Sequence, residues 1–467
     1  MKTVDLPSLF VLGAARWGGM QSTSALNAAA VRDDSAGECD FQTGLLASGE
    51  KKGKMVSDTG TQALPRATLK HRLLTNTVLL VAGGHFLLEL FHQYLPVFFP
   101  LYRAEFGLTY GQIGMITLVG TTTMSLAQPL FGYFIDRFDA RRITALSVLW
   151  LGLIMSVLGF SSNYWVLLAG VALAGFGSAA FHPAGASVVT KATEAGKRGR
   201  AVSFFAVGGN IGSAGSPLLL AIGFALLGLK GTVVLLPVVV LAAIWLVNGL
   251  GQESKVDREA HRQRQSRAGQ GFLLGLVLIT VVAMTRAWFQ LSLTTYLPTL
   301  LEDRGYSVVY GGQMLFVLSL LIGVGSLFGG ILSDRFGRWQ VLLSSFALLG
   351  PAYWFFINSG GGLQFIHAGA IGFLLGCTYP TTVVVAQEVW PRGMAMASGL
   401  VMGLGWWPGG LGATFTGWVA DQVTLDTALE GLVMAPVLGA LLMAAFAIAL
   451  HRRSGSSTAT MDPSSAG

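Results

Sequence analysis

The sequence predicts an all-α membrane protein in which twelve transmembrane helices form two six-helix bundles. Three observations predict this fold: an apolar composition, twelve long apolar segments, and a repeat of about half the chain. Of the 467 residues, 52% are hydrophobic and only 11% are charged, against about 25% charged in ordinary soluble domains. The 62 glycines suit helices packed closely in lipid, where small residues let backbones approach one another.

The apolar segments are long enough to cross a membrane as helices, which takes roughly 20 residues each. Several contain Gly or Pro, which membrane helices tolerate better than soluble ones. We expect transmembrane helices at residues 73–100, 111–134, 143–161, 165–189, 201–228, 232–250, 271–300, 311–332, 341–358, 363–389, 394–419 and 428–450.

Basic residues concentrate in alternate loops. One set of loops has only Arg103, Lys230 and Arg304. The other set has eighteen: Arg72, Arg137, Arg141, Arg142, Lys191, Lys197, Arg198, Arg200, Lys255, Arg258, Arg262, Arg264, Arg267, Arg335, Arg338, Arg392, Arg452 and Arg453. Because cytoplasmic loops carry the excess of Lys and Arg, both termini are predicted to be cytoplasmic, in the plasma membrane (the inner membrane of a bacterium).

The chain divides into five predicted parts. Residues 1–70 are polar and rich in small residues, and we expect a disordered extension; residues 451–467 are expected to be a disordered tail. The bundles span 71–250 and 271–450, and a basic cytoplasmic linker, 251–270, joins them. The net charge of +7 is dispersed over short loops, so the lipid bilayer is the expected partner and nucleic acid is not.

The repeat is clearest after the second helix of each bundle. The run Gly132-Tyr-Phe-Ile-Asp136-Arg137-Phe, which leads into Arg141-Arg142, recurs as Gly330-Ile-Leu-Ser-Asp334-Arg335-Phe-Gly337-Arg338. Asp334 follows Asp136 by 198 residues, and Tyr379-Pro380 follows His182-Pro183 by 197. A duplication of this length predicts two parallel six-helix repeats.

With these two loops, residues 73–450 resemble the major facilitator superfamily, whose signature runs G-x-x-x-D-R-x-G-R-[RK]. The first copy departs from the signature, because Asp139 stands where Gly is usual. Six further blocks resemble the fosmidomycin-resistance-type transporters: His85–Glu89, Gly175–Pro183, Val207–Ser213, Ala386–Pro391, Ser398–Leu400 and Gly409–Gly412. That family often has a Glu and an Arg at the places held here by Ala184 and Ser187, so two charges of its polar network are missing.

Two lone charges mark the candidate site. Glu89 is the only Asp, Glu, Lys or Arg between Arg72 and Arg103, and Arg286 is the only one between Arg267 and Glu302. Charges at membrane depth are costly unless they face protein or water and find partners. The resemblance implies that the two helices flank a central cavity, so we expect Glu89 and Arg286 to share it. Protonation of Glu89 would free Arg286 for an anionic substrate; the bland alternative is a permanent structural ion pair.

Other polar residues are added to this candidate site. His85 and His92 lie within one turn of Glu89, and His182 lies in a family block. Gln290 and Gln387 are polar residues in apolar segments that we expect to line the cavity. We expect no metal at the His85–His182 pair, because no Cys or carboxylate cluster with ligand spacing accompanies it. No cofactor is expected either.

The two signature loops are predicted to form conformational latches at the cytoplasmic face. An acid there favours the N-terminus of a neighbouring helix, while arginines tie helix ends together. The bland alternative is that these charges only set topology. The predicted latch residues are Asp136, Arg137, Arg141, Arg142, Asp334, Arg335 and Arg338.

These features predict a monomeric secondary transporter, not an enzyme, which works by alternating access on a small organic compound that is drug-like or anionic. The resemblance favours export coupled to proton entry. The main rival is an importer or exchanger of a metabolite anion that uses Arg286. A membrane sensor that does not transport is the alternative from another class.

Overall fold

The computed structural model describes residues 66–135, 138–193, 198–250, 272–390, 397 and 400–459, without the side chains at 66–76, 133–134, 198–200, 404 and 452–459. Helices joined by short turns make up this part of the chain, and no strand occurs in it. The disordered extension and the linker were predicted at 1–70 and 251–270. Apart from the first turn of helix α1, they lie outside the described residues.

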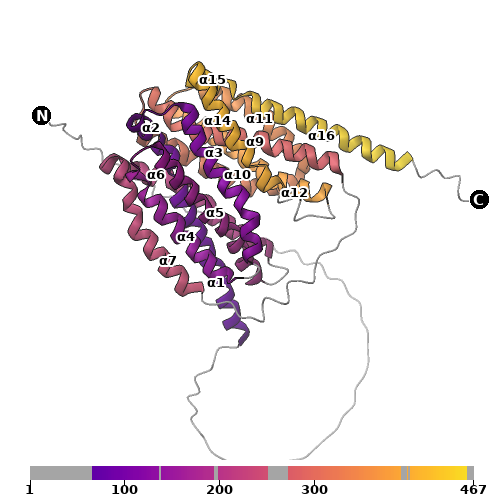
Figure 1. Ribbon diagram of the computed structural model, residues 1–467. Coiled ribbons are helices and arrows are strands. Elements are labelled where there is room, and N and C mark those ends of the chain that lie inside the picture. Colours follow the sequence, from indigo (N-terminus) through magenta and orange to yellow (C-terminus); the bar gives the residue numbers. More distant parts are fainter. Residues whose placement is uncertain are drawn as a thin grey trace, which may run out of the picture. The chain divides into compact units, whose positions relative to one another are not determined.

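Over the residues that the structure describes, each predicted transmembrane segment coincides with helical structure (Figure 1). The N-terminal half, up to residue 250, contains α1 (Arg66–His92), α2 (Leu95–Phe106), α3 (Tyr110–Ile135), α4 (Ala140–Val157), η1 (Leu158–Phe160), α5 (Tyr164–Lys191), α6 (Arg198–Leu227), η3 (Gly228–Val234) and α7 (Leu235–Leu250). The C-terminal half, from residue 272, contains α9 (Leu273–Asp303), α10 (Val308–Phe336), α11 (Arg338–Ile357), α12 (Gly362–Val389), η5 (Leu400–Leu404), α14 (Trp407–Gln422), α15 (Leu425–Gly431) and α16 (Met434–Ala459).

Nine helical stretches of the described chain are long and apolar enough to span a membrane, judged by length and composition. One of them, Ala201–Leu250, covers two predicted spans. Helices α3 and α14 fall at the remaining two predicted spans but are not among the nine. The count of twelve spans and the cytoplasmic termini therefore remain predictions.

Several helices start at a residue whose side chain accepts a backbone hydrogen bond. Asn163 caps α5, Ser307 caps α10 and Thr424 caps α15, each satisfying an N–H group that the first helical turn leaves without a partner. Asp139, the residue that departs from the family signature, caps α4 by accepting from the N–H of Arg141 at 3.0 Å. In the second copy Gly337 stands at this position with φ of +95°, a conformation that glycine adopts without strain.

Glycines allow close helix packing inside each half. Gly208 and Gly212 of α6 lie directly against the backbone of α1 at Ala82 and Phe86, where a side chain would collide. Gly409 of α14 lies against the backbone of α9 at Ala287 in the same way. The glycines therefore let α6 pack closely on α1 and α14 pack closely on α9. Helices α1 and α9 are the two that carry the lone charges.

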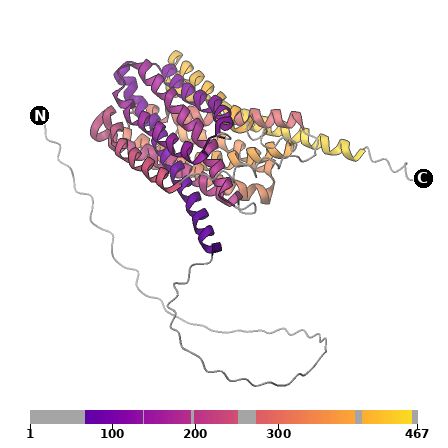
Figure 2. The ribbon, with the colours of Figure 1, turned by 60° about the horizontal axis from the view of Figure 1, so that its bottom comes forward.

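The two halves meet mainly where α3 packs on α14 and α6 packs on α10, and α2 also packs on α9 (Figures 1 and 2). The indole Nε1 of Trp407 in α14 donates to Oγ1 of Thr122 in α3 at 2.9 Å. Gly312 of α10 lies against the backbone of Pro217 in α6. The first of these pairs brings segments almost 300 residues apart in sequence into contact.

Candidate functional site

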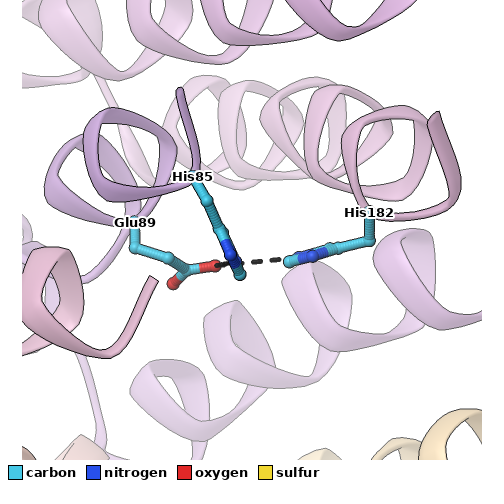
Figure 3. A group of neighbouring side chains, drawn as sticks. All are labelled: His85, Glu89 and His182. Atoms are coloured by element: carbon cyan, nitrogen blue, oxygen red, sulfur yellow. Dashed lines mark ion pairs between the residues drawn. The ribbon is translucent and has the colours of Figure 1, made fainter. Parts of the chain in front are cut away.

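Glu89 lies on α1 and is only 7% exposed. Its Oε2 accepts hydrogen bonds from Nε2 of Gln93 at 3.0 Å and from Oγ of Ser213 at 3.2 Å. Its other oxygen, Oε1, faces two imidazoles: Nε2 of His85 and Nε2 of His182, each 3.7 Å away (Figure 3). The structure thus brings His85 and His182, two of the predicted site residues, close to Glu89.

His85 is held in one orientation. Its Nδ1 lies 2.8 Å from the carbonyl oxygen of Phe205, and since a carbonyl can only accept, Nδ1 carries the proton. The ring stacks on that of Phe205, with centroids 4.3 Å apart, and contacts Phe181 at 5.5 Å. Gly209 lies directly against the imidazole, leaving no space there for even a methyl group. The Nε2 atom is therefore fixed toward Glu89.

Arg286 lies on α9 and is only 4% exposed. Its Nε donates to Oγ1 of Thr378 at 2.9 Å, and one terminal nitrogen donates to Oε1 of Gln290 at 2.7 Å. The guanidinium carbon lies 4.9 Å from the ring centre of Tyr379 and 5.5 Å from that of Trp406. Two hydroxyl or amide acceptors and two aromatic faces thus surround a buried cation.

The two sites occupy corresponding positions in the repeat. Arg286 follows Glu89 by 197 residues, and the same interval separates Gln290 from Gln93 and Tyr379 from His182. With a spacing of 198, the repeat would put Arg286 one residue from the counterpart of Glu89; the spacing of 197 makes the two positions coincide. Each charge therefore contacts the glutamine four residues later in the chain, and Glu89 also contacts α5 while Arg286 also contacts α12.

The predicted pairing of Glu89 with Arg286 does not occur in this structure. Both residues are described, and no carboxylate of the described residues lies within 4 Å of the Arg286 guanidinium. Each charge is instead satisfied by polar groups of its own half. That the two share a cavity and exchange partners during transport remains a prediction.

Two other predicted site residues are not among the direct contacts of Glu89 and Arg286 given above. His92 ends α1 and forms no ion pair with Glu89. Gln387 is half-buried on α12, roughly two and a half turns beyond Thr378. Of the two predicted glutamines, only Gln290 contacts Arg286.

In the structure a carboxylate does accompany the His85–His182 pair, contrary to the sequence expectation. Glu89 supplies a carboxylate to His85 and His182, and the ligand atoms of all three lie within 4.8 Å of one another. His182 is 93 residues from Glu89 in the sequence, so spacing along the chain does not indicate that the three ligand atoms meet.

The predicted latch residues are only partly described. Asp136 and Arg137 lie outside the described residues. Arg142 pairs with Asp139 at 3.7 Å, and Arg141 donates to the carbonyl oxygen of Leu250 at 2.9 Å.

In the second copy, Arg338 contacts Asp334 at 3.8 Å and also pairs with Glu388 of α12. Arg335 lies over the ring of Phe336. These contacts of Arg338 join helix ends within the C-terminal half.

A polar network between the halves was not predicted. At the end opposite the signature loops, Arg103 of α2 lies 2.9 Å from Asp303 of α9, and the hydroxyl of Tyr110 donates to Asp303 at 2.7 Å. Asp421 of α14 accepts from the backbone N–H groups of Tyr110 and Gly111 at 2.7 and 2.8 Å, which caps α3 across the interface. The feature of the sequence that could have indicated this network is an acidic residue at a helix end on the predicted outer face.

Two cavities, of about 330 and 680 Å³, lie elsewhere. The smaller is lined by Tyr353, Trp354 and Glu430 among others, and the larger by residues around Glu105 and Lys230. Neither cavity is lined by Glu89 or Arg286. We nevertheless place the candidate site at these two residues, because they are buried charges surrounded by polar partners.

Comparison with known proteins identifies similar membrane transporters. The chain is 29% identical to the fosmidomycin resistance protein of Escherichia coli over 387 residues, which is 80% of this chain and 94% of that protein. It is also 29% identical over 405 residues to an uncharacterized MFS-type transporter of Bacillus subtilis, covering 84% of this chain and 95% of the relative.

Solved structures share the fold. A bacterial homologue of the human lysosomal transporter Spinster, in an inward-facing and occupied conformation, superposes with a TM-score of 0.69 at 16% identity, covering 82% of this chain and 97% of that one. The nucleoside transporter NupG superposes with a TM-score of 0.65 at 13% identity, covering 80% and 99%. The family model of the Major Facilitator Superfamily matches residues 81–413, and the chain belongs to this superfamily of membrane transporters.

Proposed function

We propose that this protein is a secondary transporter that moves a small organic anion across the membrane by alternating access, and that Arg286 binds the acidic group of the substrate. One observation supports this substrate class best: Arg286 is buried, and none of the described carboxylates neutralises it. A buried cation without a counter-charge is costly, and an anionic ligand would remove that cost.

The surroundings of Arg286 suit a ligand with an acidic group. A guanidinium has five N–H donors in a planar fork, and Thr378 and Gln290 use two of them. The remaining donors can bind a carboxylate, sulfonate or phosphonate through two parallel hydrogen bonds. Tyr379 and Trp406 lie beside the guanidinium and restrict the direction from which such a group can approach.

The names of similar proteins support an anion as well. The chain is 24% identical over 322 residues to a probable sulfoacetate transporter of Cupriavidus necator, and 28% identical over 166 residues to a probable L-galactonate transporter of Escherichia coli. Sulfoacetate and galactonate are both acid anions of small size.

We propose that the direction of transport is export and that export is coupled to proton entry. We also propose that the protein has twelve transmembrane spans and that both termini lie in the cytoplasm. The similarity to a resistance protein along most of the chain supports export. Import or exchange of a metabolite anion is the second candidate, and the Arg286 site supports it equally. Glu89 as the proton carrier remains a prediction from the sequence, as does the monomeric state.

The test is transport by the purified protein in proteoliposomes with an imposed proton gradient. Lumenal pH is followed while organic acids, phosphonates and cationic drugs are added, for wild type, Arg286→Ala, Glu89→Gln and the exposed-site control Lys230→Ala. We expect an acid to change lumenal pH in wild type and Lys230→Ala but not in Arg286→Ala.

Each other outcome separates the alternatives. Transport of cationic drugs alone would overturn the anion proposal. Exchange of a labelled acid without a pH change would favour the anion exchanger. Binding without any flux would favour a sensor. Full pH-driven transport by Glu89→Gln would show that another group carries the proton.

A further inference from the structure

Three potential metal ligands converge inside the N-terminal half, in a site that no relative's name describes. His85 and Glu89 come from α1, and His182 comes from α5 (Figure 3). The side chains of His85 and Glu89 are 11% and 9% exposed, and that of His182 is 27% exposed. A small ion can therefore reach the three side chains from the side where His182 lies.

The distances do not fit direct hydrogen bonds. Oε1 of Glu89 lies 3.7 Å from each Nε2, whereas N–H···O hydrogen bonds span about 2.7–3.2 Å. In a tetrahedral zinc site with bonds of about 2.0–2.1 Å, neighbouring ligand atoms are about 3.3–3.4 Å apart. The two Glu89–histidine distances exceed this separation by only a few tenths of an ångström, and all three ligand atoms lie within 4.8 Å of one another, so small side-chain movements would seat one ion among them.

The ring orientation of His85 points to the same conclusion. Because Nδ1 donates its proton to the carbonyl of Phe205, a neutral His85 turns the lone pair of Nε2 toward Oε1 of Glu89. Two lone pairs facing each other repel unless a cation lies between them. A histidine ligand that donates its other ring N–H to a carbonyl is the usual arrangement in metal sites.

The surroundings also hold the carboxylate of Glu89 in place. Gln93 and Ser213 both donate to Oε2 of Glu89, which leaves Oε1 as the oxygen that faces the histidines. Phe205 and Gly209 fix the ring of His85 from two sides. Two of the three ligands, His85 and Glu89, are thus positioned in advance, as a binding site requires.

We propose that His85, Glu89 and His182 bind a divalent first-row transition-metal ion of the Zn²⁺ type. Two imidazole nitrogens and one carboxylate suit such ions, whereas Mg²⁺ and Ca²⁺ prefer oxygen ligands. Three protein ligands leave at least one coordination position open for water or an anion. Since α1 and α5 belong to one half, the bound ion joins two helices of that half and does not cross-link the halves.

The experiment measures Zn²⁺ binding by the purified full chain in detergent, produced without a histidine tag, in competition with a chromophoric chelator. Co²⁺ is added in a parallel sample, and its absorption spectrum reports the coordination number. The variants are His85→Asn, Glu89→Gln and His182→Asn. His92→Asn is the matched control, because it lies on the same helix near Glu89 but outside the group.

We expect one Zn²⁺ per wild-type chain, with binding that weakens as the pH falls, since protons compete for the imidazoles. Loss of a second-shell partner alone weakens metal binding by about 10–100-fold, so each of the three variants should weaken it at least about tenfold. His92→Asn should match wild type. Gly209→Ala, which pushes on the ring of His85, should weaken binding while all three ligands remain.

Either of two results would overturn the proposal. One is the absence of stoichiometric Zn²⁺ binding in wild type, which would leave a proton as the sole occupant. The other is wild-type affinity in the three ligand variants. Each variant is first checked for folding by its elution from a sizing column and its melting curve, and any one that folds is an independent test. Because binding is measured without transport, the result does not depend on the proposed anion substrate.

Discussion

Glu89 and Arg286 stand 197 residues apart at corresponding positions of the two halves, and each forms a hydrogen bond with the glutamine four residues later in the chain. The neighbours at corresponding positions differ between the halves, as the charges do: His182 faces the acid, and Tyr379 faces the guanidinium. The duplication has thus produced one half that presents an acid with histidines and one that presents a cation with aromatic rings. The following predictions test what each arrangement does.

Arg286→Lys should raise the KM for an anionic substrate although it keeps the positive charge. An ammonium cannot bind a planar acidic group with two parallel hydrogen bonds while also reaching Thr378. Loss of one hydrogen bond to a charged group costs about 1.5–3 kcal/mol, so an increase of about ten- to a hundredfold is expected. The concentration dependence of substrate uptake measures it. An unchanged KM would show that Arg286 does not touch the substrate.

Thr378→Val should weaken substrate binding indirectly. The substitution removes the acceptor for Nε of Arg286 and leaves the guanidinium free to turn. A smaller rise in KM than in Arg286→Lys is expected, with little change in melting temperature. Thr381→Val is the matched control, because Thr381 is equally buried on the same helix and its hydroxyl bonds only backbone carbonyls. Equal effects of the two variants would count against a positioning role for Thr378.

Asp421→Ala should favour opening of the halves at the Arg103 end. Asp421 caps α3 from the other half, and the loss of an N-cap costs about 0.5–2 kcal/mol. Spin labels at the exposed positions Glu105 and Glu430, one in each half, should show a larger population at long distance. Asp426→Ala is the control, because Asp426 pairs with Arg304 inside one half. A distribution that shifts equally in both variants would contradict a specific role for the cap.

Gly212→Ala should destabilise the fold, whereas Gly215→Ala should not. A methyl group on Gly212 would collide with the backbone of Phe86, but on Gly215 it would only reach ordinary contact with Leu90. Overpacking of this kind costs about 1–3 kcal/mol. Alanine in place of an unconstrained helical glycine gains up to about 1 kcal/mol. Melting curves in detergent compare the two, and equal melting temperatures would show that α1 and α6 adjust without cost.

Much of the fold could be predicted because its causes are local. A run of about 20 apolar residues must form a helix in lipid, whatever lies elsewhere in the chain. The glycines at 208 and 212 predicted close packing because small residues allow it in any bundle. Glu89 and Arg286 were found because an isolated charge in an apolar segment is costly in itself.

The partners of those charges could not be predicted in the same way. A shift of one residue turns a side chain by about 100° around a helix, so the choice between spacings of 197 and 198 decides which residues correspond. The sequence suggested that Glu89 would pair with Arg286, whereas His85, His182 and Gln93 surround Glu89 in the structure. Asp421 is an acid at a helix end on the predicted outer face, but its position in the sequence did not indicate that it would cap a helix that begins 311 residues earlier in the chain.

The sequence by itself determined the helices, the duplication and the two buried charges, because length, hydropathy and repetition are properties of single segments. Only the tertiary structure decided which polar groups meet: His182 with Glu89, Thr378 with Arg286, and Asp421 with the start of α3. These contacts depend on how each helix is rotated and where it crosses its neighbours. Rotation and crossing are set by packing over the whole bundle, which no single segment encodes.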